Sequence, residues 1–328
     1  PKNPLTFPGD VLIGVEQTYC SMIEALSHGE MVKVLVDDDE TEERIRPMRE
    51  RAGANMRNVL FPKIKSSDVW IRDYGPTFLL HRETGKKAAV KWNFNAWGGK
   101  YDDIMYDDVA GDDVVRSTGL PTFRPGIVME GGSIDVNGAG IVLTTEQCLL
   151  NENRNPHLDK EGIEGCLREY LGIDEVVWLI SGIEGDDTDG HIDDVARFVG
   201  STTVLCAVEE NEDDENYAVL QENYAILQSS IDQDGNPLTV IPLPMPGRVG
   251  GEERLPASYA NFYIGNTVVL VPVFGHPNDE VALARIQQAF PDRDVVGIDC
   301  TAMVAGLGAI HCISQQQPSP GRTEARPE

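Results

Sequence analysis

The chain has 328 residues, 41% of them hydrophobic, which is enough for one large or two ordinary domains with a buried core. Its net charge of −27 would repel nucleic acid and anionic lipid, so we expect neither as a partner and favour a small cationic ligand. The apolar runs are too short to cross a bilayer and the first residues do not resemble a secretion signal, which together predict a cytoplasmic protein.

One order of elements recurs five times along the chain. Each copy has an amphipathic helix, a short apolar strand, and then a strand or hairpin that carries unusual polar residues. The second copy is the weakest, and the Asn-Gly at 137–138 is its strong hairpin signal. The predicted helices span residues 39–53, 112–120, 160–172, 216–230 and 278–290. The predicted apolar strands span residues 58–64, 175–180, 238–245 and 294–300, and the polar third elements span 69–80, 127–145, 185–200, 257–275 and 306–318.

The polar residues of the third elements recur at similar intervals. Asp73, Glu130 and His191 are about 60 residues apart, and Cys312 follows after about twice that distance. Five copies around one axis would bring these side chains together, whereas an ordinary α/β sheet would make the spacing a coincidence. We therefore predict a five-bladed, pseudo-symmetric α/β propeller as a single domain over residues 1–317, with its site at the hub. Residues 318–328 are predicted to be a disordered tail.

The six cysteines are scattered along the chain without a CxxC pair, which predicts neither a disulfide framework nor a structural zinc site. The Asp-rich segment 185–194 could suggest calcium, but an EF-hand loop aligned on Gly190 would place Gly185 and Ala196 at ligand positions. Neither residue offers a side-chain oxygen. We therefore expect no metal in this protein.

Three polar stretches are candidates for the hub. In a strand, His191 and Asp193 would project from the same face, whereas Arg72 and Asp73 would face opposite sides. Glu130 stands beside two glycines, a pattern typical of close backbone approach or of a plain bulge. Each stretch also has a purely structural interpretation, in which the side chains satisfy one another or cap a turn.

Cys312 gives these groups a common chemistry, although alone it could be a nucleophile, a metal ligand or an inert core thiol. A thiol, an imidazole and several carboxylates suit covalent attack on the carbon of a planar cation, because paired carboxylates fix the plane of a guanidinium. Carboxylates alone would raise the pKa of the thiol, so the thiolate would need protonated His191 or the cationic substrate beside it. The neighbouring His311 would face away from Cys312 in a strand, which favours a packed or hydrogen-bonded histidine.

Six ordered motifs identify the family that this sequence resembles. They are WIRDYGPTF (70–78), KWNFNAWGGKY (91–101), MEGGSIDVNGAGIVLTTEQCLLNENRNP (129–156), DDTDGHIDD (186–194), RLPASYANFYI (254–264) and HCISQQQP (311–318). The chain resembles the agmatine deiminases of the guanidine-modifying superfamily over nearly its whole length. The resemblance implies a five-bladed pentein fold and hydrolysis of agmatine to N-carbamoylputrescine and ammonia, without a cofactor. We also expect a homodimer or a higher homo-oligomer.

The resemblance also implies a role for each matching residue. Cys312 resembles the nucleophile, His191 the general acid and base, and Glu130 the carboxylate that partners the imidazole. Asp73 and Asp193 resemble the carboxylates that clamp the guanidinium. Further substrate-binding candidates are Asp187, for the distal amine, and Trp92 and Trp97, for the alkyl chain or for core packing.

Other functions share part of this pattern. An arginine or peptidyl-arginine deiminase and an amidinotransferase would use the same thiol chemistry, and an acidic polyamine-binding protein would need the carboxylates without a reactive cysteine. The acidic runs 37–43 and 209–216 are also typical of an ordinary solvated surface. The chain departs from the family pattern at Leu307 and Ala309, where members usually carry a glycine and an asparagine ahead of the cysteine.

Overall fold

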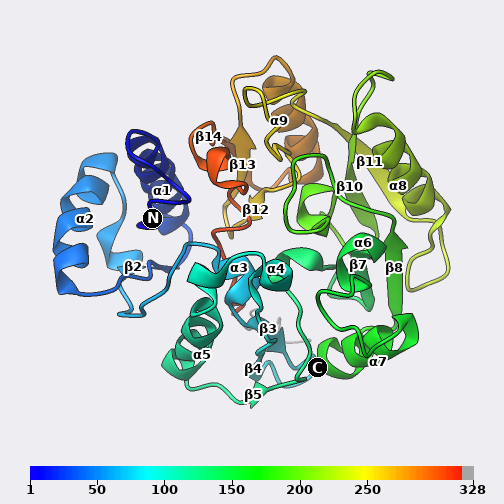
Figure 1. Cartoon of the computed structure of the whole chain (residues 1–328), viewed down its shortest axis with the longest axis horizontal. Helices are drawn as coiled ribbons and strands as arrows, with labels where there is room; N and C mark the ends of the chain where they lie inside the picture. Colours follow the sequence, from blue (N-terminus) through cyan, green and yellow to red (C-terminus); the bar gives the residue numbers. More distant parts are fainter. Residues whose placement is uncertain (320–328) are drawn as a thin grey trace, which may run out of the picture.

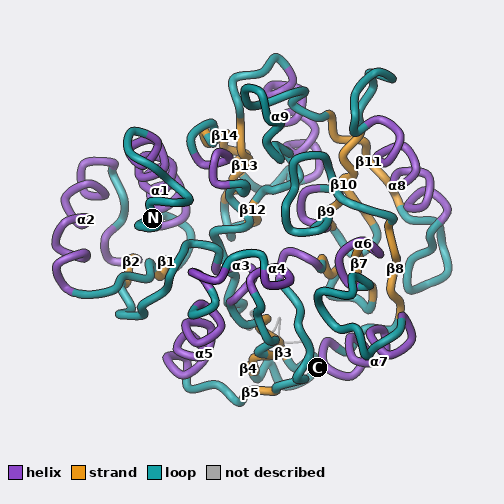
Figure 2. Tube along the Cα trace, viewed as in Figure 1, coloured by secondary structure: helices purple, strands orange, loops and turns teal. Residues whose placement is uncertain are grey.

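The computed structural model describes residues 1–319, apart from the side chains of residues 49–51. The tail predicted for 318–328 therefore lies, from residue 320 onward, outside the described residues. Within the described part of the chain, the strands form five separate sheets. Figure 1 places the helices α2, α5, α7, α8 and α9 around the rim, with α3 and α4 near the middle. Figure 2 shows the strands inside this ring of helices.

Four sheets share one plan, in which an antiparallel hairpin is followed by a rim helix and a third strand parallel to the second. In chain order these units are β3 (Thr77–Leu80), β4 (Lys87–Val90), α5 (Asp107–Thr118) and β5 (Thr122–Phe123); β6 (Asp135–Val136), β7 (Ile141–Thr145), α7 (Lys160–Leu171) and β8 (Glu175–Leu179); β9 (Ala196–Phe198), β10 (Thr203–Val208), α8 (Tyr217–Ser229) and β11 (Thr239–Pro244); and β12 (Tyr263–Ile264), β13 (Val268–Val273), α9 (Asn278–Ala289) and β14 (Asp294–Asp299). The repeated α/β units about a central axis confirm the predicted fold class.

The fifth unit joins the two ends of the chain. Its sheet has two short parallel strands on either side of one rim helix, β1 (Val32–Lys33), α2 (Asp39–Ala52) and β2 (Val59–Leu60). The chain end closes the ring: the Arg72 amide donates to the Cys312 carbonyl at 3.1 Å. The Gln315 side chain donates to the Pro76 carbonyl at 2.6 Å, and the Arg72 guanidinium donates to Gln316 at 2.8 Å.

Local sequence signals explain where the rim helices begin and end. The Asp159 side chain accepts from the Gly162 amide at 2.9 Å and caps α7, and Gly172 ends that helix with a φ of 65°. Gly119 ends α5 in the same left-handed conformation, with a φ of 64°. The helix α1 (Val11–Ser27) is not among the elements expected from the sequence; its Val15 is buried and its Thr18 hydroxyl donates to the Asp299 carbonyl at 2.7 Å.

Two expected strands are wrong at their starts, and both lead into the hub. The segment 69–80 begins with a helical turn, α3 (Ile71–Tyr74), because its amides bond to Trp70 and to the chain end rather than to a neighbouring strand. The segment 185–200 is irregular up to the turn η4 (Ile192–Asp194), and only β9 is a strand. Short turns thus carry the hub residues, and the sheets begin only after them. The remaining short turns are η1 (Met56–Asn58), α4 (Ala96–Gly99), η2 (Asp102–Ile104), η3 (Gly131–Ser133), α6 (Glu146–Leu149) and η5 (Met303–Gly306).

The apolar core divides into three clusters of buried side chains that follow the units. The largest cluster joins α1, the unit of β12 to β14 and the aromatic residues near α3 and α4. The other two lie beneath α8 and beneath α7. None of the described helices combines the length and the apolar character that a bilayer span requires.

Candidate active site

Cys312 lies in the turn that follows η5 and is 8% exposed. The side-chain amide of Asn261 donates to its sulfur at 3.1 Å, and the sulfur lies 3.9 Å from a carboxylate oxygen of Asp193. A Cβ added to Gly308 would lie 2.4 Å from the Trp70 ring and 3.2 Å from the Cys312 Cβ, so the close approach here requires glycine. The thiol is therefore held in a crowded polar environment.

The two departures in the approach to Cys312 have different structural settings. Leu307 has a φ of 70°, the left-handed region that glycine occupies without cost and that other residues rarely adopt. Ala309 is 2% exposed and lies in the turn next to the nucleophile. The amide that Cys312 receives in this chain comes instead from Asn261, on the segment that leads into β12.

His191 is buried at the point where an acidic loop meets η4. The Asp186 carboxylate accepts from the backbone amides of Gly190 and His191 and so fixes the loop. The His191 Nδ1 lies 3.8 Å from a carboxylate oxygen of Asp73. A Cβ on Gly132 would lie 2.5 Å from that nitrogen, so glycine is required there as well.

Asp73 and Trp97 meet in the hub, as expected for both. The Trp97 indole donates to Asp73 Oδ2 at 3.0 Å, and the Gly132 amide donates to Oδ1 at 2.9 Å. Burial, followed by the charges of Asp193 and Glu130, raises the pKa of Asp73 well above its usual range. The carboxylate is thus oriented by two donors.

Glu130 has a different main partner from the one expected. Its Oε1 accepts from the Arg154 Nε at 2.6 Å, with both side chains fully buried, and no described hydrogen bond joins it to His191. Arg154 also pairs with Asp189 at 2.7 Å. Since carboxylate and imidazole nevertheless lie within 4.8 Å of each other, Glu130 remains a near neighbour of His191.

His191 and Asp193 do not share a strand face, because His191 precedes the turn η4 and Asp193 lies within it. The Asp193 Oδ2 lies 2.6 Å from the Nδ1 of His311, which is buried and hydrogen-bonded. Burial raises the pKa of Asp193 to about 7, although Arg197 and Arg72 oppose this. This carboxyl group therefore changes charge near neutral pH.

The two remaining candidates differ in position. Asp187 is half-buried at the edge of the site, where it accepts from the hydroxyl of Tyr101, and its carbonyl accepts from Lys100. Trp92 lies away from the hub: its indole donates to Thr77 at 3.1 Å and its ring packs on Tyr170 in the cluster beneath α7. Of the two interpretations given for Trp92, these contacts agree with core packing.

Four site residues escaped the sequence reasoning. Asn261 and Arg154 stand inside two of the motifs, RLPASYANFYI and NENRNP, and the polarity of these residues among apolar or turn residues was the available signal. Asp194 accepts from Asn261 at 3.0 Å, and His311 pairs with Asp193. Their partners come from other blades, so no local pattern could reveal these contacts.

In the resting hub, thiol and imidazole are both neutral. Burial, followed by the charges of Asp193, Asp194 and Asp73, raises the pKa of Cys312 well above its usual range. Burial, followed by the charge of Arg154, lowers the pKa of His191 well below its usual range. A cation placed beside the carboxylates would reverse the first effect, because it would stabilise the thiolate.

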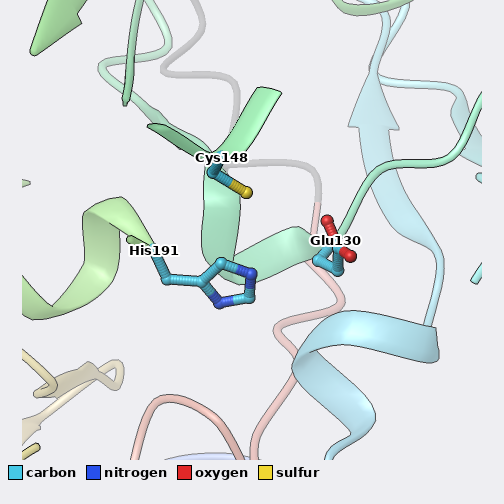
Figure 3. Close-up of side chains that lie close together, drawn as sticks. All are labelled: Glu130, Cys148 and His191. Atoms are coloured by element: carbon cyan, nitrogen blue, oxygen red, sulfur yellow. The ribbon is translucent and has the colours of Figure 1, made fainter. Parts of the chain in front are cut away.

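One group of buried side chains could hold a metal ion. Glu130, Cys148 and His191 offer ligand atoms that all lie within 4.8 Å of one another, and Figure 3 shows the three side chains turned toward a common space. The third member, the Cys148 thiol, was not singled out by the sequence and is not one of the catalytic candidates. The expectation that the protein works without a metal stays a prediction.

Comparisons with known proteins assign the family. The sequence model of the Porphyromonas-type peptidyl-arginine deiminase family matches residues 1–318, and the chain belongs to that family. It is 38% identical to the agmatine deiminase of Ectopseudomonas mendocina, over 93% of this chain and 88% of that protein.

Solved structures agree with this assignment. The agmatine deiminase of Enterococcus faecalis superposes with a TM-score of 0.88 at 33% identity, covering 98% of this chain and 92% of that one. A substrate-bound agmatine deiminase of C. jejuni, in which a cysteine is replaced by serine, gives a TM-score of 0.83 at 33% identity, covering 93% of this chain and 87% of that one.

Proposed function

We propose that this protein is an agmatine deiminase, which hydrolyses agmatine to N-carbamoylputrescine and ammonia. The observation that carries the proposal is the hub itself, where the Cys312 thiol lies beside Asp193 and a buried histidine, His191, lies beside Asp73. Family membership and the relatives named agmatine deiminases support the same reaction.

Substrate binding prepares the nucleophile. The guanidinium lies between Asp73 and Asp193, which accept its N–H groups and hold its plane against the thiol. The positive charge lowers the pKa of Cys312, and the Asn261 amide donates to the sulfur as negative charge develops on it. The thiol proton passes to His191, so the substrate itself forms the reactive ion pair.

Two tetrahedral intermediates complete the reaction. The Cys312 sulfur attacks the guanidinium carbon, and His191 returns its proton to the departing nitrogen, which leaves as ammonia. His191 then takes a proton from water, which attacks the amidino-cysteine. Collapse of the second adduct releases the ureido product and the thiol. Glu130 orients the imidazole and balances its charge, while Arg154 holds Glu130 in place.

Agmatine is favoured over arginine by the charges around the hub. A substrate carboxylate needs a cation to bind it, but Arg154, Arg197 and Lys100 are each paired with a carboxylate of the protein. The guanidinium of Arg72 is buried and donates to the His311 carbonyl and to the Gln316 side chain. The half-buried Asp187 at the edge of the site suits the distal amine of agmatine. Trp97, with its ring near the clamp, suits the alkyl chain.

The test compares three substrates. Purified protein is incubated with agmatine, arginine or a blocked arginine peptide, and ammonia and ureido product are measured side by side. We expect turnover of agmatine far above that of the other two. Turnover of arginine or of the peptide without turnover of agmatine would contradict the proposal.

A cytoplasmic location and a homodimer or higher homo-oligomer stay predictions. Light scattering of the purified protein tests the oligomeric state.

A further inference from the structure

A buried cluster of soft and hard metal-binding groups lies beside the catalytic histidine. Glu130 comes directly before η3, Cys148 lies in α6, and His191 comes directly before η4, so three separate turns bring them together. All three residues are at most 2% exposed. Their ligand atoms lie within 4.8 Å of one another, and the side chains point to one space (Figure 3).

Two of the three ligand atoms have no other partner within the described residues, and the third, the Cys148 sulfur, has only a long contact of 4.0 Å with the Thr188 carbonyl. Both the Oε2 of Glu130 and the Nε2 of His191 are buried and lack a hydrogen bond there. The other oxygen of Glu130 is taken by Arg154, and the Nδ1 of His191 is on the side of Asp73. Buried polar atoms without a partner are costly, and a ligand that satisfies both would be stabilised.

The geometry points to a zinc site: we propose that Glu130, Cys148 and His191 bind one Zn²⁺ ion, which inhibits the enzyme. A thiolate, an imidazole and a carboxylate with an open fourth position form a set that Zn²⁺ accepts. Tetrahedral coordination places ligand atoms about 3.3–3.8 Å apart. Side-chain rotations that move each ligand atom by about 1 Å would bring the three atoms to these distances. Solvent occupies the fourth position.

Charge balance favours the ion despite a nearby guanidinium. Binding releases the Cys148 proton to solvent, so that one thiolate and one carboxylate neutralise the two positive charges of the metal. Arg154, the cation in contact with Glu130, is already paired with Asp189 at 2.7 Å. The assembled cluster therefore carries no net charge, which a buried site requires.

The consequence for catalysis rests on the proposed function. Zn²⁺ on the Nε2 of His191 occupies the nitrogen that faces Glu130 and prevents the proton cycle at that ring. Asp73, which lies near the Nδ1, and Asp193, which contacts His311 and Cys312, are not ligands of the metal and remain free for the guanidinium. Zinc should therefore lower kcat and leave the KM for agmatine nearly unchanged.

The activity test uses Cys148, which takes no part in the proposed reaction. Wild type, Cys148→Ala and the control Cys206→Ala are titrated with zinc chloride during agmatine turnover, and then treated with EDTA. Cys206 is equally buried but lies in β10, outside the cluster. We expect Cys148→Ala to keep its basal activity within about twofold and to need at least about tenfold more zinc for half inhibition. Equal sensitivity of all three proteins would overturn the proposal.

A binding test is independent of agmatine turnover. Cobalt(II), which replaces zinc and absorbs light when bound to a thiolate, is titrated into Cys312→Ser protein and into the same protein with Cys148→Ala added. We expect one thiolate-bound cobalt in the first and none in the second, with Cys148→Ser as a volume-conserving variant if alanine unfolds the protein. Loss of cobalt binding on changing Cys312 alone would assign the metal to the nucleophile and contradict the site. A protein that binds cobalt without turning over agmatine would refute only the proposed function.

Discussion

The two buried histidines of the hub lie in regions with opposite hydrogen-bonding states. His311 is fixed by two hydrogen bonds. Its Nδ1 lies 2.6 Å from Asp193, and its backbone amide donates to the Asn261 side chain at 2.9 Å. His191 has a longer contact of 3.8 Å to Asp73, and its Nε2 has no partner among the described residues. A histidine that transfers protons needs a nitrogen free to change partners, and the Nε2 of His191 is such a nitrogen, whereas the Nδ1 of His311 is already paired with Asp193. Proximity in sequence to the nucleophile is therefore the poorer guide.

The largest expected effect comes from removing the Cys312 thiol, on which the proposed roles of both histidines depend. Replacing Cys312 by alanine removes the atom that forms the covalent intermediate, and we expect agmatine turnover to fall by at least about 10⁴-fold. Ammonia release is measured, and circular dichroism checks that the fold is kept. Cys300→Ala, which removes another buried thiol outside the hub, is the matched control and should stay within about threefold. Wild-type turnover by Cys312→Ala would refute the mechanism.

The comparison itself is tested by changing each histidine to asparagine. His191→Asn should lower kcat by about 10²–10⁴-fold, the usual contribution of a general acid and base. His311→Asn should lower kcat/KM by about tenfold or less, because it only weakens the positioning of Asp193. Steady-state kinetics on agmatine give both values. A larger loss for His311→Asn than for His191→Asn would exchange the two roles.

Asn261 links His311 and Asp194 to the nucleophile. Its amide donates to the Cys312 sulfur at 3.1 Å and to Asp194 at 3.0 Å, so it stabilises the thiolate. A hydrogen bond to a charged group contributes about 1.5–3 kcal/mol, so Asn261→Ala should lower kcat/KM by about 10–100-fold. Asn223→Ala, at a buried asparagine of α8, is the matched control for loss of stability alone. The rate of thiol alkylation of Cys312 should fall only in Asn261→Ala.

The carboxyl group of Asp193, which pairs with His311, should also set the lowest pH at which the protein is fully active. The pKa of Asp193 is raised to about 7, mainly by burial, so this carboxyl group becomes neutral as the pH falls through that value. A neutral group loses its attraction for the guanidinium, and kcat/KM should fall by about tenfold per pH unit below pH 7. The loss should appear mainly in KM. A kcat/KM that stays constant from pH 8 to pH 5.5 would contradict this assignment.

The smallest expected effect concerns the loop that leads to the nucleophile. Leu307 has a φ of 70°, and this conformation costs a residue other than glycine about 1–2 kcal/mol. Leu307→Gly should remove this strain but loosen the unfolded chain, for a net gain of about 1 kcal/mol or less in the free energy of unfolding. Urea unfolding measures it, with agmatine turnover expected within about twofold. A destabilisation above about 1 kcal/mol would mean that the leucine side chain contributes packing that outweighs the strain.

The sequence predicts the outer part of this protein better than its centre. Rim helices such as α7 and α9 follow from apolar periodicity, and both were predicted to within one residue at each end. The hub residues were identified by their motifs and approximate spacing, but their contacts were not. The two interpretations of Trp92 could not be separated, because an indole in a motif looks the same whether it faces a blade core or the hub. Arg154 and Asn261 were missed because their partners Glu130, Asp189, Asp194 and Cys312 are distant in the sequence.

The ring closure described above places the nucleophile after all of its hub partners in chain order, so the ribosome makes it later than any of them. Cys312 acquires its neighbours only after the Arg72 amide has bonded to its carbonyl and Gln315 has bonded to Pro76, which joins residues 312–315 to residues 72–76. Until then the carboxylate clamp and the acid–base histidine are made but lack a thiol to activate. A chain that lacks Cys312, or in which it has not yet bonded to Arg72, thus cannot attack a guanidinium, and this reactivity appears only in the completed fold.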